Sequence, residues 1–116
     1  MPSEKERGAL LDMLRHIELA ERFAQGRTVE SLQTDPMPLY AVIRCLEVIS
    51  EASRQLSDEF KARYPKMPWR EMAAAGNVYR HDYEDVLPER IWKTLNEDLP
   101  PLRHLIENEL TGMSRA

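Results

Sequence analysis

Four polar side chains in the second half of the chain have types and spacing that suit phosphate chemistry. Asn77, Arg80 and His81 lie at positions i, i+3 and i+4, so a helix would carry them on one face, and Tyr83 follows shortly after. Histidine can transfer a proton near neutral pH, and arginine can neutralise a phosphate oxygen through paired hydrogen bonds. The group therefore predicts a site for a phosphate-containing substrate. The alternative is that His81 interacts only with the helix dipole and Tyr83 only packs at a helix end.

The stretch from Pro68 to Tyr83 is predicted to be the helix that carries these residues. Proline suits the first helical position, because its missing N–H is not needed there, and the carboxylate of Glu71 suits the first turn. Within the stretch, Ala73 to Gly76 form a patch of small residues. Such a patch would let another backbone approach closely.

The remaining sequence is also predicted to be helical. Ser3 and Glu6 have the spacing of a capping box, and apolar residues then recur at helical intervals until Gly26. Further helical segments are expected from Thr28 to Asp35 as a short link, from Pro36 to Leu56, from Ser57 to Pro65 as a short segment, and from Asp85 or Pro88 onward with an interruption at Pro100 and Pro101. No stretch alternates as a strand would. The fold class is therefore all-α, a bundle of four main helices with short helical links, in one domain over residues 1–116.

The segment from Pro36 to Leu56 is predicted to be the central helix. One apolar stripe and a second stripe of small residues leave only a narrow polar strip, so this helix is either central or buried against a second subunit. The polar strip consists of Arg44, Glu47, Glu51 and Arg54. A solvated face of salt bridges explains the strip, and the alternative is that it lines a cleft opposite His81.

The overall charge excludes a protein that coats nucleic acid non-specifically. The 116 residues include 20 acidic and 16 basic side chains, for a net charge of −4. Any contact with nucleic acid must therefore be local. One local basic group is formed by Lys61, Arg63, Lys66 and Arg70 together with Arg80, although a solvated surface also explains it.

Cysteine and histidine spacing predicts neither a disulfide framework nor a metal or other cofactor. Cys45 is the only cysteine, and its position indicates a packing residue. His16 and His104 lack metal-ligand spacing, so both are predicted to be surface or packing residues. The sequence also has no long apolar run and no signal-peptide pattern, so a cytoplasmic protein that does not cross a membrane is expected.

Four separated segments resemble the HepT-like branch of the HEPN superfamily. They are Ala41 to Ala52, Arg63 to Glu71, Asn77 to Tyr83 and Asn96 to Pro101, and the resemblance covers nearly the whole chain. It implies a helical bundle that forms a homodimer, with the two active motifs facing each other across the interface. It also implies a toxin that cleaves RNA, paired with a minimal nucleotidyltransferase antitoxin that can adenylylate the motif tyrosine, Tyr83.

The chain departs from the family pattern at one position. The family motif is an arginine, a short spacer and then His-x-Tyr; His81 and Tyr83 match its second half, and Asn77 matches the polar residue that often follows the arginine. Gly76 occupies the position of the arginine itself. Arg80 is the nearest substitute, because it follows Gly76 by one helical turn.

Two functions are consistent with this pattern. The first is a metal-independent endoribonuclease, with His81 as general base or acid, Arg80 as the cation, Asn77 in the same site, and Arg44, Glu47 and Glu51 in support. The alternative is a weak or inactive HEPN protein that binds or regulates a nucleotidyltransferase, because the motif arginine is replaced by Gly76.

Overall fold

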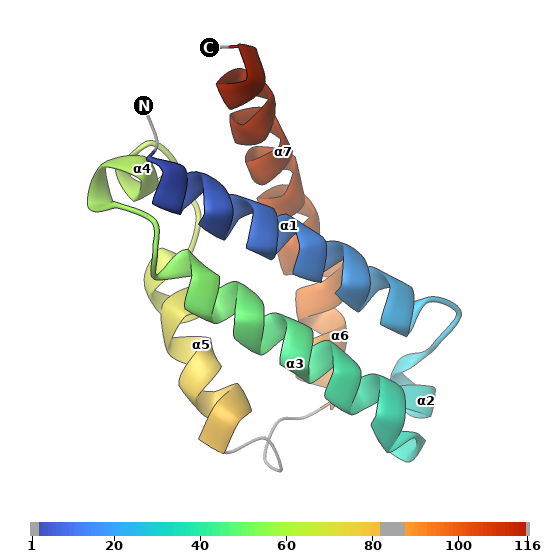
Figure 1. Cartoon of the computed structure of the whole chain (residues 1–116). Helices are drawn as coiled ribbons and strands as arrows, with labels where there is room; N and C mark the ends of the chain where they lie inside the picture. Colours follow the sequence, from blue (N-terminus) through green and yellow to red (C-terminus); the bar gives the residue numbers. More distant parts are fainter. Residues whose placement is uncertain (1–2, 82–87, 116) are drawn as a thin grey trace.

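Four long helices make up most of the protein. The structure is a computed structural model that describes residues 3–81 and 88–115. The long helices are α1 (Glu4–Ala24), α3 (Pro36–Ser53), α5 (Trp69–His81) and α7 (Leu99–Arg115), and the short ones are α2 (Val29–Thr34), α4 (Asp58–Ala62), α6 (Pro88–Lys93) and a π-helical turn, η2 (Thr94–Asp98) (Figure 1). No strand occurs in the described ranges. The predicted all-α fold with four main helices is confirmed.

Side-chain caps explain where the helices begin. Ser3 accepts a hydrogen bond from the Glu6 N–H at 3.1 Å, and the Glu6 carboxylate accepts one from the Ser3 N–H at 3.2 Å, which is the predicted capping box. Thr28, Asp35 and Ser57 cap α2, α3 and α4.

The start of α5 differs from the prediction by one residue. Pro68 precedes the helix instead of occupying its first position, and its carbonyl accepts a hydrogen bond from the Met72 N–H at 2.9 Å. The proline therefore supplies the first acceptor of the helix, and its missing N–H remains harmless.

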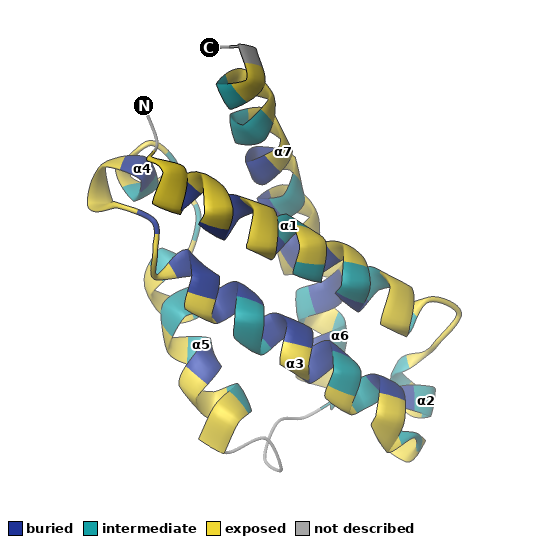
Figure 2. Ribbon diagram, in the orientation of Figure 1, coloured by how far each residue is buried: buried dark blue, intermediate teal, exposed yellow. Residues whose placement is uncertain are grey.

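The central element of the core is α3. It packs against α1 on one side and α5 on the other (Figure 1), and nine of its 18 residues are buried (Figure 2). Cys45 is 2% exposed, which confirms that it is a packing residue, and burial raises the pKa of its thiol. Because α3 contacts α5 directly, it fixes the position of the residues that α5 carries.

The interruption expected near the two prolines is a π-helical turn. Pro100 and Pro101 have no N–H groups, so the carbonyls four residues earlier lose their usual helical partners. Just before the prolines, a helical hydrogen bond spans five residues instead of four: the N–H of Leu99 donates to the carbonyl of Thr94. Pro88 is the first residue of α6, as expected.

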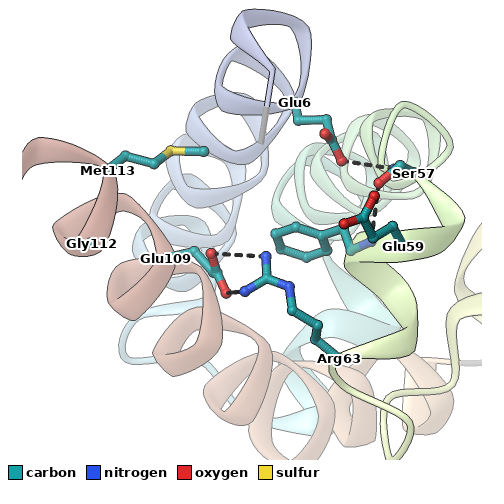
Figure 3. A pocket seen from close by; sticks show the side chains of 8 residues that line it. Glu6, Ser57, Glu59, Arg63, Glu109, Gly112 and Met113 are labelled. Carbon is teal, nitrogen blue, oxygen red and sulfur yellow. Dashed lines mark hydrogen bonds and ion pairs between the residues drawn. The ribbon is translucent and has the colours of Figure 1, made fainter. Parts of the chain in front are cut away.

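The carboxylate of Glu6 connects the N-terminal ends of two helices. Besides capping α1, it accepts a hydrogen bond from the backbone N–H of Ser57, the cap of α4, at 2.8 Å. Figure 3 shows this contact at the edge of a pocket of about 370 Å³, which is also lined by the ion pair between Arg63 and Glu109. The hydrogen bond from Ser57 is the main cause that lowers the pKa of Glu6, and burial opposes it.

We expect Glu6→Gln to lower the free energy of unfolding near neutral pH by about 1 kcal/mol, because an amide replaces a charged acceptor. The folded-state pKa of Glu6 lies below its ordinary value of 4.5, so the carboxylate stabilises the fold above that value. This contribution is lost as the pH falls through the lower, folded-state pKa. Urea unfolding of wild type and variant, from about pH 7 down to about pH 3, should show a smaller decline for Glu6→Gln. Glu4→Gln, at an exposed position in the same helical turn, is the control; equal pH dependence in all three proteins would contradict the assignment.

Candidate active site

Helices α3 and α5 are in close contact where Gly76 meets Ser50. Gly76 is buried, and its N–H donates a hydrogen bond to Ser50 Oγ at 2.9 Å, while Ser50 Oγ donates to the Ala73 carbonyl at 3.1 Å. A Cβ atom on residue 76 would lie 2.6 Å from Ser50 Oγ and 3.1 Å from Ser50 Cβ. The predicted close approach at the small-residue patch is therefore confirmed. A side chain at residue 76, where the resemblance to the family motif implies an arginine, would therefore have to displace Ser50.

Arg80 lies one helical turn after Gly76 and faces the same neighbour, α3. Its Nη2 atom is 3.2 Å from Glu51 Oε2, and both side chains remain about half exposed. Glu51 also lies within 4.0 Å of Arg54 Nε, so two arginines share one carboxylate. Gly76 is buried at the contact between the helices, whereas the side chain of Arg80 reaches past this contact to the surface.

Only part of the polar strip on α3 reaches the end of α5. Glu51 contacts Arg80, the residue before His81, and not His81 itself. Glu47 is half-buried and forms an ion pair with Arg44 at 2.5 Å, as the interpretation of a salt-bridged face requires. The structure thus brings Glu51 to the candidate site and leaves Arg44 and Glu47 paired with each other.

Asn77 and His81 lie on the solvent-facing side of α5. Both side chains are exposed, and neither forms a hydrogen bond or ion pair with another residue that the structure describes. His81 ends the helix directly after Arg80, so the imidazole and the guanidinium leave the same helical turn. Tyr83, the predicted site of substrate binding or adenylylation, lies outside the described residues.

The opposite side of α5 is anchored by Tyr79. Its hydroxyl is hydrogen-bonded to the side chain of Thr94 in the π-helical turn, and burial is the main cause that raises the pKa of this phenol. Trp69 anchors the other end of the helix, since its indole N–H lies 3.2 Å from the Lys61 carbonyl and 3.1 Å from the Tyr64 carbonyl. These contacts fix the rotation of α5 about its axis, which turns Arg80 toward α3 and His81 toward solvent.

Two contacts of the site were missed by the sequence analysis. Ser50 holds α5 in place through hydrogen bonds with Gly76 and Ala73, and the sequence analysis did not single it out. Arg54 belongs to the predicted polar strip, but its hydrogen bond from Nη2 to the Ala73 carbonyl at 2.9 Å was not expected. The small residues of α5 predicted a close contact, but no local signal identified its partner.

The other histidines are not part of this site. His16 is half-buried, with Nδ1 2.7 Å from the Asp12 carbonyl, and exposed His104 lies 3.3 Å from Asn108. Among the residues that the structure describes, no three His, Cys, Asp or Glu side chains gather as ligands of a metal ion would. No helix in the described ranges is both long and apolar enough to span a membrane.

Comparison with known proteins shows the family. The chain matches the family described as Ribonuclease HepT-like over residues 13–109. It is 40% identical over 98 residues to a protein of Thermococcus cleftensis named "Probable ribonuclease HepT", covering 84% of this chain and 89% of the relative. A Methanocaldococcus jannaschii protein is 33% identical over 84% of this chain and 90% of its own length, and a Caldanaerobacter subterraneus protein is 34% identical over 79% and 81%; the names of both also describe an RNase. No solved structure matches the chain significantly. The chain therefore belongs to the HepT-like ribonuclease family.

Proposed function

We propose that this protein is a metal-independent endoribonuclease whose active site lies at the exposed end of α5. The observation that carries the proposal is the adjacency of Arg80 and His81, with Arg80 oriented by Glu51 and His81 open to solvent. The names of the curated relatives, which describe ribonucleases, support RNA as the substrate.

The side chains supply the chemistry that RNA cleavage without a metal needs. His81 takes the proton from a ribose 2′-hydroxyl, the 2′-oxygen attacks the adjacent phosphorus, and the bond to the 5′-oxygen breaks as that oxygen gains a proton. The products are a 2′,3′-cyclic phosphate and a 5′-hydroxyl end. Arg80 stabilises the negative charge that develops on the phosphoryl oxygens, and Asn77 offers an amide for hydrogen bonds to the substrate.

We propose that two copies of the chain form this site together. The reaction needs both a base and an acid, and His81 is the only histidine at this end of α5 among the described residues. A second copy placed face to face would supply the second imidazole. Exposed apolar side chains on the same two helices support such a contact: Met37 is 80%, Tyr40 53% and Val78 45% exposed.

We further propose a toxin–antitoxin context in the cytoplasm. The resemblance in the motif segments supports a minimal nucleotidyltransferase as the antitoxin, with Tyr83 as the residue that it adenylylates. Adding a nucleotide two residues after His81 would place a bulky, charged group beside the catalytic residues. Such a modification would block RNA from the site without any change of fold.

Cleavage of single-stranded RNA by the purified protein in excess EDTA tests the ribonuclease. We expect cleavage with 2′,3′-cyclic phosphate ends, at a rate unchanged by added Mg²⁺, since no step uses a metal. The His81→Ala variant, purified in parallel, controls for contaminating nucleases. Mass spectrometry must first show that Tyr83 is unmodified. Absence of cleavage by this unmodified protein would refute the ribonuclease and favour the alternative, a binding or regulatory partner of a nucleotidyltransferase.

A further inference from the structure

A row of polar and cationic side chains extends from the candidate active site along α5. Arg70, Ala74, Asn77 and His81 are spaced by four, three and four residues, which places them in one stripe of the helix, and all four are exposed. We call these four residues the α5 track. It extends over twelve residues, from Arg70 to His81, so its length is roughly 16 Å.

The track is positively charged although the protein as a whole is acidic. Arg70 is at one end, where it forms no ion pair or hydrogen bond with another described residue. Arg54 reaches the middle of the track from α3, because its Nη2 atom bonds to the carbonyl of Ala73. Arg80 flanks the other end, and among the described residues Glu51 is the carboxylate that contacts Arg54 and Arg80. Glu71, beside Arg70, is the second carboxylate along the described part of this edge, so three guanidinium groups and two carboxylates leave a net positive charge.

The shape of the track suits an extended strand. Ala74, between Arg70 and Asn77, presents only a methyl group, so the helix surface is low there. Glu71 follows Arg70 in sequence, but one residue turns a helix by about 100°, which places its carboxylate off the stripe. The start of the track is held rigidly, because the indole of Trp69 bonds to two carbonyls of the preceding segment.

We propose that the α5 track binds the RNA strand beside the cleavage point, with Arg70 contacting a phosphate that is not cleaved. This inference rests on the proposed ribonuclease function and identifies where the substrate continues beyond the reacting phosphate. Single-stranded RNA fits better than an acidic protein, because an extended strand can follow the length of the track and place one phosphate at Arg70 and another near Arg80. Arg70 is a binding residue, and the reacting atoms lie at the other end of the track.

Binding of a fluorescent single-stranded RNA to Arg70→Gln, in a His81→Ala background that prevents cleavage, tests the inference. Each phosphate contact to a single strand contributes about 0.7 to the salt dependence of log K, so the variant's slope should be smaller by about 0.7. Between about 50 and 200 mM salt, its affinity should therefore fall about two- to threefold less than that of its parent. Arg15→Gln is the matched control, since it removes one exposed charge on α1, which α3 separates from α5 (Figure 1).

Cleavage kinetics give a second, independent readout. In the protein with His81 intact, Arg70→Gln should raise KM for a long RNA several-fold and leave kcat nearly unchanged, because Arg70 binds the ground and transition states equally. Identical affinities and salt slopes for Arg70→Gln and Arg15→Gln would overturn the inference while leaving the ribonuclease intact. If Arg70→Gln loses as much affinity for a polyglutamate peptide as it loses for RNA, the inference is also overturned, since the arginine would then bind anions in general. Absence of cleavage by the wild type would instead refute the proposed ribonuclease. The RNA-binding measurement does not depend on cleavage, so it distinguishes that outcome from failure of the inference about the α5 track.

Discussion

Alanine at His81 or at Arg80 is expected to lower kcat for RNA cleavage by roughly two to four orders of magnitude, with little change in stability. His81→Ala removes the group that moves the proton, and Arg80→Ala removes the cation that stabilises charge on the phosphoryl oxygens. Both side chains are exposed at the end of α5, and Arg80 forms only a surface ion pair, so the fold should tolerate both changes. Steady-state cleavage of a defined RNA, with circular dichroism of each variant, measures both effects.

The controls separate chemistry from charge. Arg15→Ala and His16→Ala remove the same two side-chain types from α1 and should leave kcat unchanged. Arg80→Lys should recover only part of the rate, because an ammonium group lacks the paired donors of a guanidinium. If Arg80→Ala cleaves as fast as the wild type while His81→Ala is inactive, then Arg80 has not replaced the motif arginine and another cation must be sought.

Restoring the family arginine by Gly76→Arg is expected to damage the protein instead of improving it. A Cβ atom at this position would lie 2.6 Å from Ser50 Oγ, so the new side chain must push α5 away from α3. We expect a loss of about 1–3 kcal/mol in the free energy of unfolding, as in other overpacked contacts, and a decrease in cleavage because Arg80 moves with the helix. Urea denaturation and cleavage assays of the same preparation measure both.

Two further variants test whether the contact with Ser50 is the cause. Gly76→Ala should also destabilise the protein, although alanine raises helix propensity by roughly 1 kcal/mol. Gly8→Ala is the matched control, because a Cβ on this residue of α1 meets nothing within 4 Å, and it should be neutral or stabilising. Combining Gly76→Ala with Ser50→Gly should recover stability relative to the sum of the single effects. If Gly76→Ala stabilises the protein as much as Gly8→Ala does, the close contact is not real.

Local sequence signals predicted the helices well. The capping residues Ser3, Thr28 and Ser57 mark helix starts that the structure confirms, and the prolines at 100 and 101 mark the interruption. These signals succeed because a cap and the N–H that it binds lie within three residues of each other. The central position of α3 was also predictable, since so little of its surface is polar.

Contacts between helices were less predictable, because they depend on how distant segments rotate and slide against one another. The sequence grouped Glu47 with Glu51, but only Glu51 faces Arg80, and Glu47 is held by Arg44. Similarly, the small-residue patch that includes Gly76 predicted a close contact but did not identify the residue that makes it. The structure shows a positive reason for glycine there, in the serine that approaches from α3.

The π-helical turn between α6 and α7 makes chain length as important as residue type in this part of the protein. A turn with one extra residue rotates everything after it by about 100° relative to an uninterrupted α-helix. Buried residues on both sides of the turn belong to the same core: Ile91 before it, and Leu102 and Ile106 after it. An insertion or deletion of one residue in the turn would therefore rotate the last helix by about 100° and turn part of its apolar face into solvent, whatever the type of the residue.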